Sequence, residues 1–167
     1  MPEAGERDRE FSYFALGLSP EDYKRRIERI FALELSAGGL RLTTQRRRIL
    51  DALLKARRHL SEDEIYSELA GFGIGRATVF RTLKVLKKCG LVEEVLGDGR
   101  PRFEVRWRRP HHDHLICVDC GRIQEIRWPA LEAIQERACR KAGFAARWHR
   151  HEIFGLCRSC SKRQRSE

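Results

Sequence analysis

No stretch of this sequence approaches the length of an apolar membrane span, and the N-terminus does not show the basic-then-apolar pattern of a secretory signal. We therefore expect a cytoplasmic protein with no membrane partner. The sequence also has no His-Glu-x-x-His run, no Gly-x-Ser-x-Gly elbow and no phosphate-binding loop. These absences argue against common enzyme classes. A metal-dependent hydrolase is therefore a disfavoured alternative, and we expect no catalytic activity.

Positive charge dominates the composition. The 167 residues include 34 Lys and Arg against 24 Asp and Glu, which gives a formal net charge of +10 at pH 7 and a pI near 9.8. A basic surface indicates a polyanionic partner, with nucleic acid as the first candidate. The hydrophobic content of 41% is enough for folded cores, and the length allows one ordinary domain or two small ones.

The first half of the chain predicts four helices and a β-hairpin. Ser19 precedes Pro20 as a helix N-cap, and Ser61 with Glu64 forms a capping box. Periodic apolar residues predict helices over about 20–36, 43–56, 61–70 and 76–89, and strands over 91–95 and 102–105. Short helices followed by a basic helix and a hairpin are typical of a winged helix-turn-helix, which binds DNA.

The second half predicts a smaller α/β domain. A basic linker ending in Pro110 precedes it, so we expect domains over 1–106 and 111–167 with a hinge over 107–110. We expect a helix over 129–142, a frayed polar tail over 161–167, and strands over 115–118, 123–127 and 144–156. The predicted fold class is therefore α+β, with an N-terminal winged helix-turn-helix domain followed by a small α/β domain.

Four of the six cysteines form two Cys-x-x-Cys pairs, Cys117 with Cys120 and Cys157 with Cys160. Each pair can hold one edge of a tetrahedral thiolate site, and a closed shell of four thiolates gives zinc a structural role. The alternative is two reduced or redox-active pairs. The other cysteines lie in predicted helices and are expected to pack there as small apolar residues: Cys89 and Cys139.

Nitrogen and oxygen ligands gather just before the first cysteine pair, at His111, His112, Asp113 and His114. If the following strand extends back over them, His111 and Asp113 point to one face and His112 and His114 to the other. This alternation predicts two metal sites. The candidate partners are His59, Glu104, Glu125, Glu132, His149 and His151. Such ligands suit iron(II), zinc, manganese or nickel, and the alternative is a solvated, pH-sensitive cluster.

Several segments together resemble the ferric uptake regulator family, over roughly residues 40–160. The matching segments are 41–46, 77–83, 97–100, 111–117 and the terminal Cys-x-x-Cys. The family consists of metal-responsive bacterial transcription regulators that bind A/T-rich inverted-repeat operator DNA as dimers. The resemblance implies a DNA-binding winged helix, a C-terminal α/β dimerisation domain with structural zinc, and assembly as a homodimer or a tetramer.

The resemblance also assigns metal ligands. It places a regulatory site on His59, Glu104, His114 and Glu125, with His112 as a further ligand. It places a second site on His111, Asp113, Glu132 and His149, and the structural zinc on the four paired cysteines. His59 and Glu104 belong to the first predicted domain. The resemblance therefore implies that an ion joining ligands from both domains favours the DNA-binding arrangement.

On the DNA side, the resemblance assigns the recognition helix to about residues 76–88. The residues expected to contact DNA are Arg41, Thr44, Arg46, Arg76, Phe80 and Arg81. Arg41 is expected in the minor groove, where A·T-rich DNA attracts cations. Phe80 stands where most members have tyrosine, and it can still touch a thymine methyl group. The extension before Leu40 is longer than in many members and is expected to pack on the winged helix or to contact DNA.

Glu125 discriminates among branches of the family. The peroxide-sensing branch usually has aspartate there, so the resemblance favours iron(II) as the regulatory ion and an iron-dependent repressor. Manganese(II) or zinc(II) could replace iron(II) in vitro. The alternatives within the family are zinc-, manganese- and peroxide-sensing regulators. The alternative outside it is a DNA-binding protein or zinc scaffold that does not respond to metal.

Overall fold

The computed structural model describes residues 17–56, 58–97, 99–107, 109 and 111–165. The chain divides into two compact units, Met1–Arg109 and Pro110–Glu167. Residues 1–16 of the N-terminal extension and two residues of the predicted hinge, Arg108 and Pro110, lie outside the described residues. No helix within the described ranges is long and apolar enough to cross a membrane.

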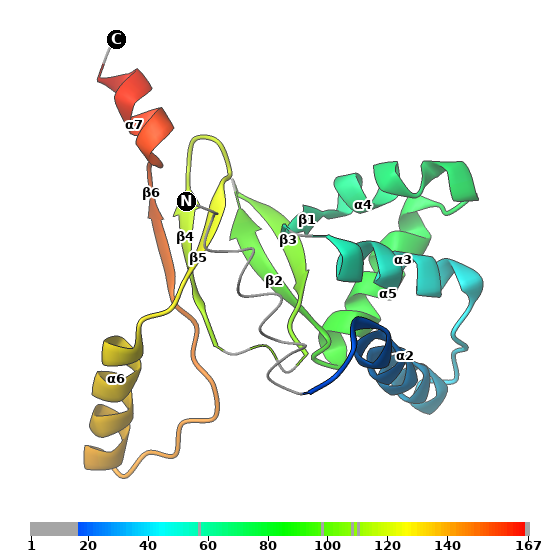
Figure 1. Ribbon diagram of the computed structural model, residues 1–167, viewed down its shortest axis with the longest axis horizontal. Coiled ribbons are helices and arrows are strands. Elements are labelled where there is room, and N and C mark those ends of the chain that lie inside the picture. Colours follow the sequence, from blue (N-terminus) through cyan, green and yellow to red (C-terminus); the bar gives the residue numbers. More distant parts are fainter. Residues whose placement is uncertain (1–16, 57, 98, 108, 110, 166–167) are drawn as a thin grey trace. The chain divides into compact units, whose positions relative to one another are not determined.

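The first unit begins with helix α2 (Pro20–Ala37), drawn in blue in Figure 1. Its N-cap is Ser19, whose hydroxyl accepts a hydrogen bond from the Asp22 backbone N–H at 3.1 Å. Every fourth residue along one side is buried, namely Tyr23, Ile27, Phe31 and Leu35. These side chains belong to the same apolar core as the helices that follow. The described part of the N-terminal extension therefore packs on the winged helix.

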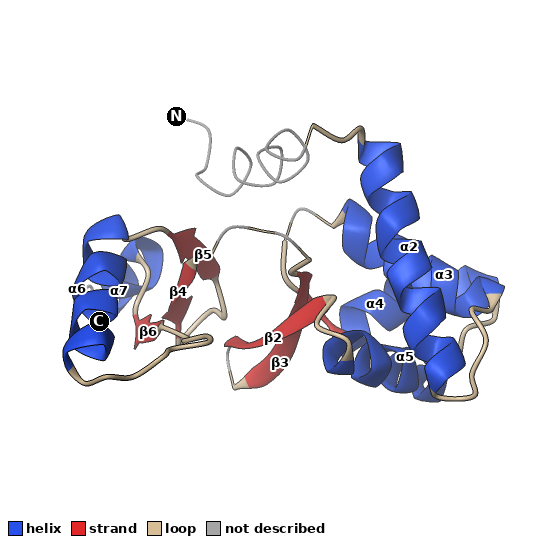
Figure 2. Ribbon diagram, turned by 90° about the horizontal axis from the view of Figure 1, so that it is seen from below, coloured by secondary structure: helices blue, strands red, loops and turns tan. Residues whose placement is uncertain are grey.

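The predicted winged helix-turn-helix is confirmed in this unit. Its three helices share one core, and a 3-10 turn separates the last two: α3 (Thr44–Lys55), α4 (Glu62–Glu68), η1 (Ala70–Phe72) and α5 (Arg76–Lys88). Strands β2 (Val92–Gly97) and β3 (Arg100–Val105) form the antiparallel wing (Figure 2). An unpredicted strand, β1 (Leu60–Ser61), pairs with β3 and gives the order β1-β3-β2.

The second unit is built on a three-stranded sheet. Its strands are β4 (Asp113–Cys117), β5 (Ile123–Ile126) and β6 (Glu152–Gly155), in the order β5-β4-β6. The central strand β4 is antiparallel to β5 and parallel to β6. Helix α6 (Pro129–Lys141) lies between β5 and β6 in the chain, and α7 (Arg158–Gln164) follows β6. The two helices lie at opposite ends of the strands (Figure 1).

Two predictions for this unit were wrong. The strand expected over 144–156 is confined to Glu152–Gly155, and residues 144–151 are irregular, because only four residues of this segment pair with β4. Residues 161–164 of the tail that was expected to fray belong instead to α7, which starts at Arg158, and residues 166–167 lie outside the described residues. This helix has no apolar stripe that would reveal it in the sequence. The helix carries Cys160, and its N-cap is Cys157. Both cysteines lie close to the first cysteine pair.

Candidate metal centres and nucleic-acid interface

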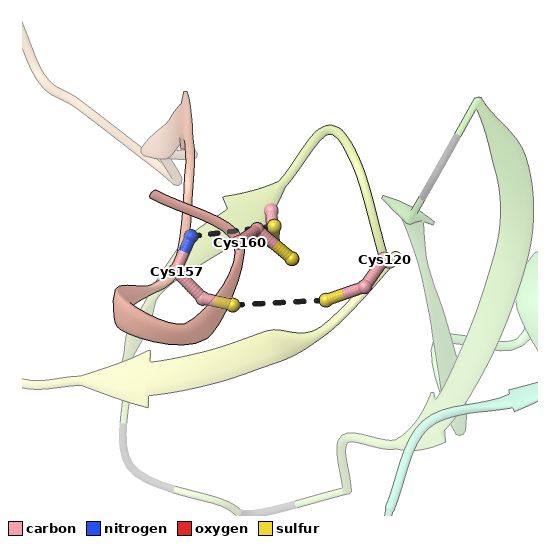
Figure 3. Close-up of side chains that lie close together, drawn as sticks. Cys120, Cys157 and Cys160 are labelled. Carbon is pink, nitrogen blue, oxygen red and sulfur yellow. Dashed lines mark hydrogen bonds between the residues drawn. The ribbon is translucent and has the colours of Figure 1, made fainter. Parts of the chain in front are cut away.

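The four paired cysteines come together at one end of the second unit's sheet. Cys117 ends β4, Cys120 follows in the turn, Cys157 caps α7 and Cys160 lies within it. Their sulfur atoms all lie within 4.8 Å of one another, and none forms a disulfide. Cys120 Sγ and Cys157 Sγ are 3.8 Å apart (Figure 3). A tetrahedral zinc site with bonds of about 2.3 Å has edges of about 3.8 Å, so the donor set fits this ion.

Backbone donors favour the ionised form of two of these thiols. The Cys157 backbone N–H donates to Cys117 Sγ at 3.3 Å, and with the backbone N–H of Cys120 it lowers the pKa of Cys117 to about 6. The backbone N–H of Cys160 likewise lowers the pKa of Cys157. The pKa of Cys160 is raised instead, because the Asp119 carboxylate and then burial disfavour a further negative charge. The thiolate is the form that binds metal, so the site is partly prepared for it.

Asp119 does more than fill the turn between Cys117 and Cys120. Arg163 Nη2 on α7 lies 2.7 Å from Asp119 Oδ2 and 3.4 Å from Cys160 Sγ. The arginine therefore ties the turn of the first cysteine pair to the helix that carries the second pair. The sequence gives no signal for this contact, because the two residues are 44 positions apart and neither stands in a motif that joins them.

A second cluster of predicted ligands forms within the same unit. It contains two imidazoles and two carboxylates whose ligand atoms lie within 4.8 Å of one another: His111, Asp113, Glu132 and His149. His111 Nε2 is 3.0 Å from Asp113 Oδ1, and His149 Nε2 is 3.1 Å from Glu132 Oε1. Asp113 lies on β4, Glu132 is in the first turn of α6, and His149 precedes β6. Three separate segments therefore supply one nitrogen and oxygen donor set.

The second unit also carries three of the predicted regulatory ligands. His114 on β4 stands opposite Glu125 on β5, so both side chains belong to one face of the sheet. The His112 ring lies beside that of His114, with ring centroids 5.0 Å apart. All three side chains are buried. His151, which the resemblance could not place, joins neither ligand cluster of this unit and instead accepts a backbone hydrogen bond from His114 N–H at 3.1 Å.

The first unit carries the other two predicted regulatory ligands. Leu60 on β1 pairs with Phe103 on β3, which places His59 opposite Glu104. His59 Nε2 lies 3.3 Å from Glu104 Oε1, and only 6% and 2% of their side-chain surfaces are exposed. The other carboxylate oxygen of Glu104 accepts a hydrogen bond from Arg109. The predicted regulatory set is thus divided between the two units.

Helix α5 presents a basic and aromatic face to solvent. Its inner side is buried in the core through Val79, Thr82, Leu83 and Leu86. The predicted DNA contacts Arg76, Phe80 and Arg81 are all exposed, and Phe80 keeps 49% of its surface accessible. Arg76 forms an ion pair with Asp63 and its guanidinium lies 4.4 Å from the centre of the Tyr66 ring. A phosphate contact by Arg76 would therefore compete with Asp63, whereas Phe80 and Arg81 are accessible on the outer face.

The remaining predicted DNA contacts surround the start of α3. Arg41 and Thr44 are exposed, whereas Arg46 is half-buried and donates to the Arg41 backbone carbonyl at 2.5 Å. The N-cap of α3 is Thr43, which accepts a hydrogen bond from Arg46 N–H at 3.3 Å. Arg46 therefore has a structural role in holding the Arg41 backbone next to the helix start.

Comparison with known proteins gives one consistent answer. The model of the family described as "Ferric uptake regulator family" matches residues 37–154. The peroxide operon regulator of Bacillus subtilis is 38% identical over 137 residues, which cover 80% of this chain and 93% of that protein.

Solved structures agree with this result. The ferric uptake regulator of Helicobacter pylori, described as having three functional metal-binding sites, has a TM-score of 0.75 at 26% identity, covering 83% of this chain and 93% of that one. The regulator of Francisella tularensis with iron has a TM-score of 0.67 at 33% identity, covering 74% of this chain and 96% of that one. The chain therefore belongs to the ferric uptake regulator family, whose members bind DNA as dimers, and it is a metal-responsive transcription regulator rather than an enzyme.

Proposed function

We propose that the protein is an iron(II)-dependent repressor whose regulatory ion binds ligands from both units. The observation that carries this proposal is the division of buried ligands: His59 with Glu104 in the first unit, and His112, His114 and Glu125 in the second. Imidazole nitrogens and carboxylate oxygens are both ligands that a divalent transition-metal ion binds.

The chain's own residues convert metal binding into a DNA-binding shape. His59 directly precedes β1, and Glu104 lies on β3. Strand β3 is part of the wing that follows the recognition helix. If these two ligands and those of the second unit bind one ion, the arrangement of the two units becomes fixed. A ligand can shift such an equilibrium only by its difference in affinity for the two arrangements. Ligands drawn from both units provide that difference.

The same proposal includes two further metal sites. The cysteine cluster would hold structural zinc, because four thiolates leave no open coordination position. The cluster of His111, Asp113, Glu132 and His149 would hold a second ion within the second unit. The related Helicobacter pylori protein, with its three functional metal-binding sites, supports this count.

Dimerisation is assigned to the second unit. It exposes several large apolar side chains, including Phe144 at 67%, Trp148 at 76% and Phe154 at 52%. Its buried apolar residues are few in comparison. Exposed apolar surface of this extent marks an interaction surface. Members of the family form dimers, so the partner for this surface is a second copy of the chain. The dimer would act on A/T-rich inverted repeats in the cytoplasm, with Arg81 and Phe80 of each copy in the major groove and Arg41 in the minor groove.

Peroxide sensing is the second candidate function. The 38% identity to the Bacillus subtilis peroxide operon regulator favours it. Glu125 argues against it, because the peroxide-sensing branch usually has aspartate at this position. The two functions differ in a direct assay. Iron-loaded protein treated with dilute hydrogen peroxide should keep its mass and its DNA affinity, whereas an addition of one oxygen to a ligand histidine with loss of DNA binding would establish the peroxide sensor.

The proposal is tested by measuring DNA affinity as a function of metal. The probe is a duplex selected by the iron(II)-loaded protein from a random-sequence pool, titrated under anaerobic conditions with iron(II), manganese(II), zinc(II) or no added metal. DNA affinity should be low without added metal and should rise on titration with iron(II). DNA affinity that does not change with iron(II), or that rises only with manganese(II) or zinc(II), would show that the iron assignment is wrong.

A further inference from the structure

Arg109 is a buried arginine at the end of the first unit. Its side chain is 5% exposed, and it pairs with Glu104, whose side chain is 2% exposed. Arginine is rarely buried unless its charge is matched, so the pair is a specific feature of this segment. Each oxygen of the Glu104 carboxylate has a different neighbour. Oε1 faces His59 Nε2 at 3.3 Å, and Oε2 accepts from the Arg109 guanidinium.

The chain segment that ends in Arg109 is held on the first unit at several points. The Arg106 backbone N–H donates to Leu91 O at 2.9 Å, and the Trp107 carbonyl accepts from the Tyr23 hydroxyl at 2.7 Å. The Arg109 backbone N–H donates to Arg106 O at 3.0 Å. The turn built by these bonds returns the Arg109 side chain to β3, five residues back along the chain.

The neighbouring arginine provides a comparison. Arg106 Nη1 lies 2.9 Å from Glu93 Oε1. Glu93 on β2 stands opposite Glu104 on β3 in the antiparallel register of the wing. The Arg106 side chain is 40% exposed, however, and Glu93 belongs to none of the ligand sets. Arg106 and Arg109 thus bind two neighbouring carboxylates of the wing. Of these two arginines, Arg109 has the buried side chain and binds the proposed metal ligand.

We propose that Arg109 is the positioning residue of the regulatory metal site: it holds Oε2 of Glu104 so that Oε1 stays beside His59, ready to bind the ion with one oxygen. The inference rests on the proposed function, in which Glu104 is a ligand. A carboxylate free to rotate could bind with either oxygen or both, whereas a guanidinium hydrogen-bonded to Oε2 leaves Oε1 as the oxygen for the ion. Because Arg109 is the last residue of the first unit, the same pair also ties the ligand to the segment that leads to the second unit.

The experiment compares regulatory-site affinity and spectrum among variants. Cobalt(II) replaces the regulatory ion in protein that retains its zinc, affinity is measured by competition with a fluorescent chelator, and the visible absorption band reports the ligand geometry. Arg109→Ala should weaken cobalt(II) binding by roughly 10- to 100-fold, the usual effect of removing a residue that orients a metal ligand. It should also shift the absorption band. Arg109→Lys keeps the charge without the planar fork and should restore part of the affinity but not the band.

Arg106→Ala is the matched control and should stay within about twofold of wild type, since surface ion pairs contribute little. If Arg109→Ala binds cobalt(II) with wild-type affinity and spectrum, the positioning role is refuted. Glu104→Gln separates this result from failure of the proposed function: wild-type cobalt(II) binding by that variant would remove Glu104 from the site altogether. Adding Arg109→Ala to Glu104→Gln should have no further effect on affinity, and an additive loss would mean that Arg109 acts elsewhere. If Arg109→Ala does not fold, Arg109→Lys and Arg109→Gln replace it in the same comparison, after thermal melting has shown that they are folded.

Discussion

Replacement of Cys157 by serine should destabilise the second unit. The unit Pro110–Glu167 has 58 residues (167 − 110 + 1), and its buried apolar residues are Ile116, Cys117 and Cys160 among those the structure describes. A core of this size rarely supplies more than about 3–5 kcal/mol. Structural zinc in small domains contributes about 10–16 kcal/mol, so loss of even a quarter of it is roughly 2.5–4 kcal/mol. The substitution should therefore remove most of the unit's stability.

The expected result is a fall of more than about 10 °C in the melting temperature of the second unit, together with loss of zinc and of the dimer. Zinc is measured by elemental analysis, and the dimer by sedimentation. Cys139→Ser is the matched control, because Cys139 is a half-buried cysteine of α6 outside the cluster. Cys139→Ser should keep zinc and dimer. A Cys157→Ser protein with one zinc per chain, an unchanged melting temperature and an intact dimer would show that the cysteine cluster does not stabilise the second unit through zinc.

Three further predictions concern the other sites. Arg81→Ala should weaken DNA binding by about 5- to 150-fold, the equivalent of about 1–3 kcal/mol for a base contact, with unchanged metal content; wild-type affinity would remove Arg81 from the interface. Glu132→Ala should lower manganese(II) binding by one site per chain without releasing zinc, as measured by equilibrium dialysis; unchanged stoichiometry would mean that the cluster binds no ion. The lowered pKa of Cys117, about 6, keeps this thiol ionised at neutral pH. Protons compete with zinc for the sulfur atoms, so zinc release to a chelator should become faster as the pH is lowered from neutral; release that is equally fast at neutral pH would contradict this.

Local sequence signals predict the helix starts and the wing well. Ser19 caps α2 as expected, and the capping box of Ser61 and Glu64 is formed. Caps are readable because they satisfy backbone groups within three residues of their own position. The wing was also expected, although its strands extend to Gly97 and Arg100. The alternation of residues 111–114 was expected from a strand extending over all four. Strand β4 begins only at Asp113, but the structure still brings His111 and Asp113 into one cluster and His112 beside His114.

Features that depend on distant partners could not be predicted. Strand β1 has two residues, too few for a period of two to be visible, and it exists because β3 offers it hydrogen bonds. Helix α7 has one buried residue, Cys160, and therefore carries no apolar period. The contacts of Arg163 with Asp119 and of Arg109 with Glu104 join charged residues in a chain that has many, so composition does not single them out.

We propose that one ion bound by residues of both units controls DNA affinity. The most direct measurement is the dissociation constant for the selected duplex with and without iron(II), for zinc-loaded wild type and for His59→Ala and Glu125→Ala. Wild type should bind about 5- to 150-fold more tightly with iron(II), the usual range of coupling between two sites. Each variant should remain a dimer and lose this difference, although the two residues belong to different units. Equal affinity of wild type with and without iron(II), or a full response in either variant, would contradict the account.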